Sequence, residues 1–233
     1  MQKNVFLNAG HFTNDPGAIY KDLKEADATR QVRDRVVSAL QNYPDMLTVY
    51  AVPDDLDLVE SIAWVNKKAT YLDGGFALDI HFNGAQPASG AEVFYFTGDS
   101  PSKALALKLL DPYIKQTKLK SRGVKPDTAS KAKRLGWIRD ITCWSLLIEC
   151  AFLQGDYDYI KTPGNLNKMA NGIVDGIFAV FNLTKPTVVE VIIPPHPEEW
   201  QDKLVKIING LDTSAEQIKT FAGDLSKLLL NGN

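Results

Sequence analysis

The 233-residue sequence contains only two cysteines, Cys143 and Cys150. Two cysteines do not form the set of disulfides that stabilises small secreted domains, so we expect both to be reduced thiols. The sequence also lacks any apolar run of the roughly 18 residues that a membrane-spanning helix requires. Stability must therefore come from an ordinary hydrophobic core, for which a hydrophobic content of 45% is sufficient.

An excess of charge of either sign is also missing. Lys and Arg number 26 and Asp and Glu number 28, which gives a formal net charge of −2. Proteins that bind polyanions usually carry an excess of positive charge, which this sequence lacks, so we expect no nucleic-acid partner. The N-terminal residues show neither the basic nor the apolar region of a signal peptide, and we therefore expect synthesis in the cytoplasm without one.

Short apolar runs alternate with longer helical patterns over most of the chain. Helical periodicity predicts helices at 24–41, 56–69, 101–118 and 165–181. Short apolar and β-branched runs predict strands at 4–8, 47–52, 75–82, 91–96, 135–138 and 144–150. The alternation predicts an α/β fold with a mainly parallel twisted sheet of about six strands and helices on both faces.

The character of the sequence changes after Leu183. Residues 184–197 are rich in proline and are typical of a linker, and residues 198–233 carry two amphipathic helical patterns. We expect a main domain at 1–183, followed by this linker and a short C-terminal helical tail. Because two helices are too few to form a core alone, we expect the tail to self-associate or to dock a partner protein.

Two of the three histidines occur where α/β sheets usually bind ligands. His11 and His81 each lie near the C-terminal end of an apolar strand, and open α/β sheets bind ligands at that edge. A single histidine of this kind is more often a hydrogen-bonded structural residue, but two at equivalent strand ends favour a shared site. His196 lies in the linker and is expected to be merely exposed.

Two glutamates stand at positions that should be buried. Glu25 continues the apolar stripe of helix 24–41, and a buried carboxylate requires compensation. Its alternative role is that of an ordinary acid at a helix N-terminus. Glu149 ends the apolar strand 144–150, where it either pairs with an arginine such as Arg139 or takes part in catalysis. Two histidines and a glutamate are a common zinc ligand set, and a further carboxylate can act as general base.

Several short stretches occur in an order that is specific when they are taken together. They are NAGHFTNDPGA (8–18), ESIAWVNKKA (60–69), LDIHFNG (78–84), GAEVFYF (90–96), SRGVKPD (121–127), LGWIRD (135–140) and SLLIECAFLQGDYDY (145–159). In this order they resemble the zinc-dependent N-acetylmuramoyl-L-alanine amidases of the Amidase_3 type, which occur in bacterial wall remodelling and as phage endolysins. The sequence departs from that family at Asp79, where serine is usual, at Ser145, where proline is common, and at Cys150-Ala151.

The resemblance implies a peptidoglycan hydrolase that cleaves the amide between N-acetylmuramic acid and L-alanine by zinc-activated water. The domain at 1–183 would then be catalytic and would bind one Zn²⁺ per chain. The implied zinc ligands are His11, Glu25 and His81. Glu149 would be the catalytic acid/base.

Three further residues are predicted to support this site. Asp79 shares a strand face with His81 and is a candidate hydrogen-bond partner for that ligand. Asn83 and Arg139 are candidates for contact with the substrate. The segment 115–134 carries eight basic residues and one acid, so it is either a solvated surface or a loop attracted to anionic wall polymers.

Two other functions are kept as alternatives. One is an inactive or weakly active peptidoglycan-binding module that uses the same groove, and the other is a zinc peptidase that acts on another wall amide. A chain without a signal peptide would reach the wall after release, as a phage endolysin does, or after delivery as a toxin.

Overall fold

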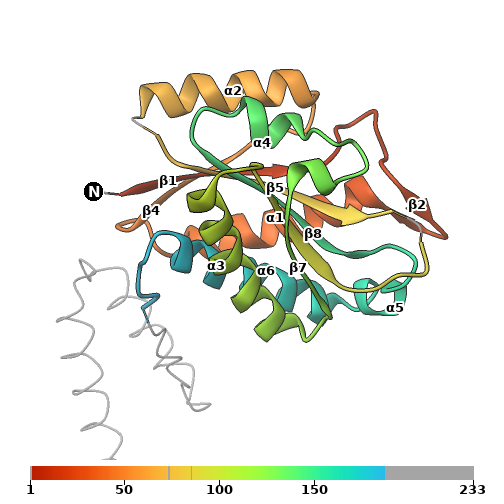
Figure 1. Cartoon of the computed structure of the whole chain (residues 1–233). Helices are drawn as coiled ribbons and strands as arrows, with labels where there is room; N and C mark the ends of the chain where they lie inside the picture. The colour runs from red at the N-terminus through yellow and green to blue at the C-terminus, as the bar shows by residue number, and fades with distance from the viewer. Residues whose placement is uncertain (1, 73, 85, 187–233) are drawn as a thin grey trace, which may run out of the picture. The chain divides into compact units, whose positions relative to one another are not determined.

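The computed structural model describes residues 2–72, 74–84 and 86–186, and within them a six-stranded sheet crosses the domain (Figure 1). Its strand order is β4-β1-β5-β8-β6-β7. The strands are β1 (Lys3–Ala9), β4 (Leu47–Ala51), β5 (Phe76–Asn83), β6 (Ala91–Tyr95), β7 (Ser121–Pro126) and β8 (Trp144–Phe152). Neighbouring strands are parallel except β6 and β8, which confirms the predicted α/β fold with a mainly parallel sheet.

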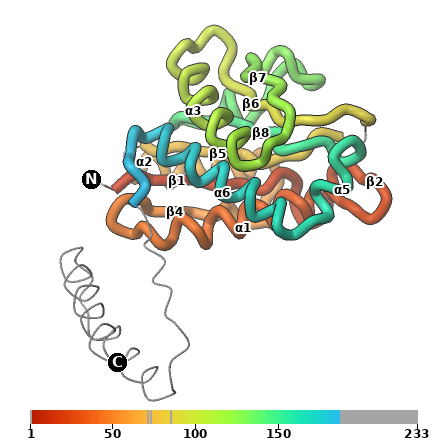
Figure 2. The backbone as a smooth tube through the Cα atoms, turned by 90° about the horizontal axis from the view of Figure 1, so that it is seen from below, coloured from red at the N-terminus to blue at the C-terminus, as the bar shows by residue number. Residues whose placement is uncertain are grey.

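Helices cover both faces of this sheet. On one face lie α1 (Glu25–Leu40), α3 (Ser100–Thr117) and α6 (Pro163–Val180), which run side by side in the view of Figure 2. On the other face lie α2 (Leu58–Tyr71) and the short α4 (Gly136–Asp140), above the sheet in Figure 1. Shorter elements are β2 (Ile19–Tyr20), β3 (Leu23–Lys24), α5 (Tyr157–Ile160) and the 3₁₀ turn at Asp127–Ala129.

The two cores follow from strands that are apolar on both faces. In β1, Val5 and Leu7 pack into the core under α1 and α6, whereas Phe6 packs into the core under α2 and α4. All three side chains are fully buried, as is typical of strands in a sheet with helices on both sides. Local signals also agree with the fold, since Asp57 and Glu60 form a capping box at the start of α2.

The prediction of a strand at 135–138 is wrong. These residues lie at and within α4, where Trp137 and Ile138 are both buried. A short apolar run looks the same in a buried helical turn as in a strand, so periodicity cannot separate them. The sixth strand is instead β7, which is polar and only partly buried because it forms an edge of the sheet.

The described part of the chain ends just after α6. Leu183 packs against the core and its backbone N–H donates to the Phe178 carbonyl at 2.8 Å, and Lys185 pairs with Asp175 at 2.8 Å. From residue 187 onward, the predicted linker at 184–197 and the predicted helical tail at 198–233 lie outside the described residues. Among the described residues, no helix is long and apolar enough to cross a membrane.

Candidate active site

The turn after β1 places His11 beside the end of β5. His11 has a positive φ of 71°, an uncommon conformation for a residue with a side chain, which turns the chain sharply after Gly10. A Cβ on Gly10 would lie 2.4 Å from the His81 ring, and one on Gly17 would lie 2.5 Å from the His11 ring. Both positions therefore need glycine for the two imidazoles to approach each other.

Glu25, the first residue of α1, lies between the two imidazoles. Its Oε2 is 3.0 Å from His11 Nε2 and its Oε1 is 3.0 Å from His81 Nδ1. One ligand atom from each of the three residues lies within 4.8 Å of the others. The backbone N–H groups of Ala18 and Phe82 each donate to this carboxylate at 3.1 Å and hold it in place. The structure thus brings together the three predicted ligands from three separate elements.

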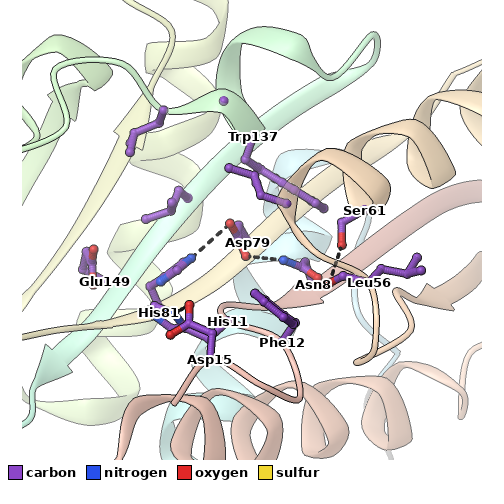
Figure 3. A pocket seen from close by; sticks show the side chains of 14 residues that line it. Asn8, His11, Phe12, Asp15, Leu56, Ser61, Asp79, His81, Trp137 and Glu149 are labelled. Atoms are coloured by element: carbon purple, nitrogen blue, oxygen red, sulfur yellow. Dashed lines mark hydrogen bonds and ion pairs between the residues drawn. The ribbon is translucent and has the colours of Figure 1, made fainter. Parts of the chain in front are cut away.

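A second carboxylate contacts the outer nitrogen of each ring. Asp15 Oδ2 is 2.7 Å from His11 Nδ1, and Asp79 Oδ2 is 3.1 Å from His81 Nε2. Asn8 Nδ2 donates to the other oxygen of Asp79 at 2.8 Å, and Figure 3 shows Asp79 between His81 and Asn8. Each imidazole therefore has one nitrogen facing Glu25 and the other held by an aspartate.

These contacts shift the pKa values in the site. Burial alone would raise the pKa of Glu25, but hydrogen bonds to His11 and His81 outweigh it and hold that pKa well below its usual range. Burial alone would lower the pKa of His81, but the charge of Asp79 and the hydrogen bonds to Asp79 and Glu25 hold it well above its usual value. Positive charge on the imidazoles balances these carboxylates, which is a role that a bound cation can also fill.

Glu149 lies beside this cluster on β8 (Figure 3). It is directly opposite His81 in the pairing of β5 with β8, and its Oε2 is buried without a hydrogen-bond partner in the described structure. Burial raises the pKa of its carboxyl to about 7. Pairing with Arg139, the alternative considered from the sequence, does not occur, because that guanidinium donates to Asp127 through Nε at 2.5 Å and Nη2 at 3.1 Å.

The two predicted substrate-contacting residues lie in different places. Asn83 lines the same cavity as Glu149, and its Nδ2 donates to Glu92 at 3.4 Å. Arg139 lines a separate cavity together with Trp144 and Cys143. The structure therefore brings Asn83 to the site, whereas the contacts of Arg139 give no support to a substrate role.

Two hollows open from the cluster, and both include His81 and Glu149. One, here called the apolar lobe, has a volume of about 300 Å³ and is lined by side chains such as Phe12, Leu56 and Trp137. The other, called the polar lobe, has a volume of about 430 Å³. Its outer wall includes Asn83, Glu92, Arg122, Lys125 and Lys131. The sequence did not identify Arg122, Lys125 or Lys131 individually as residues of the site, although all three lie in the basic segment 115–134.

Comparison with known proteins identifies the family. The Amidase_3 family, described as N-acetylmuramoyl-L-alanine amidase, matches residues 5–179. The endolysin of Bacillus phage SPP1 is 27% identical over 189 residues, which are 79% of this chain and 68% of that protein. The germination-specific N-acetylmuramoyl-L-alanine amidase of Bacillus subtilis (strain 168) is 26% identical over 198 residues, 77% of this chain and 80% of that protein.

The fold matches a solved amidase as well. The catalytic domain of the amidase CwlV from Bacillus (Paenibacillus) polymyxa var. colistinus has a TM-score of 0.68 and 26% identity, over 78% of this chain and all of that domain. The matched region contains the complete cluster of His11, Glu25 and His81 as well as Glu149. The chain therefore belongs to the Amidase_3 family of N-acetylmuramoyl-L-alanine amidases and is a peptidoglycan hydrolase that cleaves the amide between N-acetylmuramic acid and L-alanine.

Proposed function

We propose that this amidase requires one Zn²⁺ per chain, held by His11, Glu25 and His81. The observation that carries the proposal is the convergence of these three donors, from three separate elements, to within 4.8 Å. Two imidazole nitrogens and one carboxylate oxygen are a set that catalytic zinc sites use, with a fourth position left for water. Aspartates on the outer nitrogens of both rings are the usual support for such histidine ligands.

The bound metal would supply a Lewis acid and a water molecule of lowered pKa. Glu149 is the general base and acid of the proposal. Its buried Oε2 has no hydrogen-bond partner in the described structure, so it is available to accept a proton from the attacking water. A carboxyl pKa raised by burial suits the return of that proton to the leaving amine of L-alanine. The unpartnered oxygen beside the cluster is the feature that favours catalysis over mere binding.

The substrate and setting follow from the family. Peptidoglycan is the proposed partner, and the chain would act on the cell wall after release or delivery, in line with the relative from phage SPP1 that is named an endolysin. We further propose that residues 1–183 are the catalytic domain and that 198–233 serve self-association or partner docking. All the residues assigned to the site lie within the matched segment 5–179.

Digestion of purified peptidoglycan followed by mass analysis tests the function. Cleavage at the proposed bond releases glycan with a free lactyl carboxyl and peptides with a free L-alanine amine. New amines at another residue would instead identify a wall peptidase, and an absence of products would identify an inactive binder. Removal of metal with a chelator should abolish the activity, and added Zn²⁺ should restore it; full activity in the chelated protein would exclude zinc dependence.

A further inference from the structure

The polar lobe contains a pair of cations that share one carboxylate. Glu92 Oε2 accepts from Arg122 Nε at 2.8 Å and from Lys125 Nζ at 2.5 Å. Glu92 is 4% exposed, whereas the side chains of Arg122 and Lys125 are 30% and 32% exposed. Two positive charges held by one negative charge leave one net positive charge, presented at the wall of the cavity.

Arg122 and the shared carboxylate each have one further contact that holds the pair in place. The Arg122 guanidinium lies 4.8 Å from the centre of the Phe152 ring, and Asn83 Nδ2 donates to Glu92 Oε1 at 3.4 Å. Lys131 adds a further exposed cation to the lobe. A pre-positioned pair of cations loses little side-chain freedom when it binds an anion, which distinguishes it from mobile surface lysines.

The position of the pair relative to the catalytic residues follows from the strand register. Glu92 is directly opposite Glu149 in the β6–β8 pairing, and His81 is opposite Glu149 on the other side. The three side chains therefore share one face of three adjacent strands. With neighbouring strands about 4.8 Å apart, the backbone of Glu92 lies about 5 Å from that of Glu149 and about 10 Å from that of His81.

We propose that Arg122 and Lys125 bind a free carboxylate of the substrate's stem peptide, on the residue that follows L-alanine. The inference rests on the proposed function. One extended residue spans at most about 3.6 Å, so the carboxylate of the second residue lies roughly 7 Å from the scissile carbonyl carbon. That reach is comparable to the spacing of about 5–10 Å that separates Glu92, the carboxylate that holds both cations, from Glu149 and His81 across the sheet.

The chemistry of the two sides of the scissile bond favours the peptide as the occupant. On the glycan side, the lactyl carboxyl is consumed in the amide, and the acetylated sugars are neutral. On the peptide side, a D-glutamate in the second position that is linked through its γ-carboxyl carries a free α-carboxylate. Its amidated form, D-isoglutamine, has no charge there. The polar lobe thus selects stems with an unamidated second residue.

The test compares kcat/KM for two soluble muropeptides that differ only in D-glutamate or D-isoglutamine at the second position. We expect the wild-type protein to prefer the acid by about tenfold, the lower end for hydrogen bonds to a charged group, because the cations are partly exposed. In Lys125→Met this preference should fall to near one, mainly through a higher KM for the acid substrate. Lys125→Arg should retain it.

Lys115→Met, which removes the same charge from the exposed face of α3, should keep the full preference. Equal hydrolysis of both substrates by the wild-type protein, or an unchanged preference in Lys125→Met, would overturn the inference. Hydrolysis of neither substrate would instead refute the proposed function. If Lys125→Met does not fold, Arg122→Gln, which removes the other cation of the pair, should lower the preference in the same way, and an unchanged preference there would overturn the inference. A third substrate carries D-isoglutamine at the second position and a phosphodiester on the muramic acid. Its kcat/KM should be the same in the wild-type protein and in Lys125→Met. A higher value in the wild-type protein would show that the lobe binds phosphate instead.

Discussion

Glu149 and His81 face each other across the parallel pairing of β8 with β5. The register places a carboxylate whose Oε2 has no hydrogen-bond partner in the described residues next to an imidazole that is held on both sides, by Glu25 and by Asp79. This difference in surroundings suits the different tasks that are proposed for the two side chains. His81 has its geometry fixed by its partners, as a ligand requires, whereas Glu149 has an oxygen available to receive a proton.

The replacement of Glu149 by glutamine should separate catalysis from metal binding. The amide keeps the shape of the side chain but cannot accept and return a proton, so turnover should fall by about 10²–10⁴-fold. Zinc content and the thermal unfolding midpoint should stay close to those of the wild-type protein, because Glu149 is outside the proposed set of three ligands. Wild-type turnover would refute its role as acid/base, and loss of zinc would make it a ligand.

The replacement of His81 by alanine should remove the metal. Only one imidazole and one carboxylate of the cluster would be left, and two ligands bind zinc weakly. Metal analysis after dialysis should give near-complete loss, with Glu149→Gln as the variant that keeps it. A full complement of zinc in His81→Ala would rule out this ligand set.

The replacement of Asp79 by asparagine should weaken metal binding without removing a ligand. Asp79 is 2% exposed and holds the outer nitrogen of His81, and the loss of such a partner typically costs 10–100-fold in affinity. Asp79→Ser, which introduces the residue usual in the family, should lose at least as much, because asparagine keeps an amide oxygen that can accept from the ring whereas the serine hydroxyl is on a shorter side chain. Zinc affinity by competition with a chelator is the measurement, with the exposed Asp111→Asn as control. Equal affinities in all four proteins would contradict a positioning role.

The ion pair of Asp127 with Arg139 should make stability depend on pH in the acid range. Burial would raise the pKa of Asp127, but the hydrogen bonds from Arg139 and Thr97 outweigh it and hold that pKa below its ordinary value. A lowered folded-state pKa gives stability that is present above the unfolded value, about 3.9, and is lost as pH falls through the folded value. Asp127→Asn should cost about 1–3 kcal/mol at pH 7 in urea unfolding.

That difference between Asp127→Asn and the wild-type protein should shrink as the pH is lowered below about 4, because the wild-type carboxyl is then protonated too. Asp158→Asn, on the exposed side of α5, serves as the control and should leave the profile unchanged. A gap that is constant from pH 7 to pH 3 would show that the charge of Asp127 does not contribute.

A chain that ends at Pro186 should stay folded and cleave small soluble wall fragments. Every residue of the proposed site lies before this point, and the contacts of Leu183 and Lys185 with α6 are kept. Circular dichroism and activity on muropeptides test the division, and the oligomeric state of the full chain shows whether the tail self-associates. Unfolding of the shortened chain would show that the catalytic domain needs residues beyond 186.

The sequence alone determined the fold class and the positions of the reactive side chains along the chain. Strand-end histidines and a glutamate on an apolar helical stripe were recognisable because local periodicity states which positions should be buried. Periodicity failed at 135–138, where a buried helical turn has the same apolar pattern as a strand, and at β7, where an edge strand needs few apolar residues.

Only the tertiary structure decided which side chains meet. Arg139 is near Glu149 in sequence but contacts Asp127, while Glu92 and Lys125, separated by 33 residues, share an ion pair. Glu149 lies beside Glu92 and His81 because β8 is inserted between β5 and β6, although β5 and β6 follow each other along the chain. Strand order and register are set by the packing of the whole sheet, which no local pattern encodes, and they place the proposed base, the ligand cluster and the cation pair on one face.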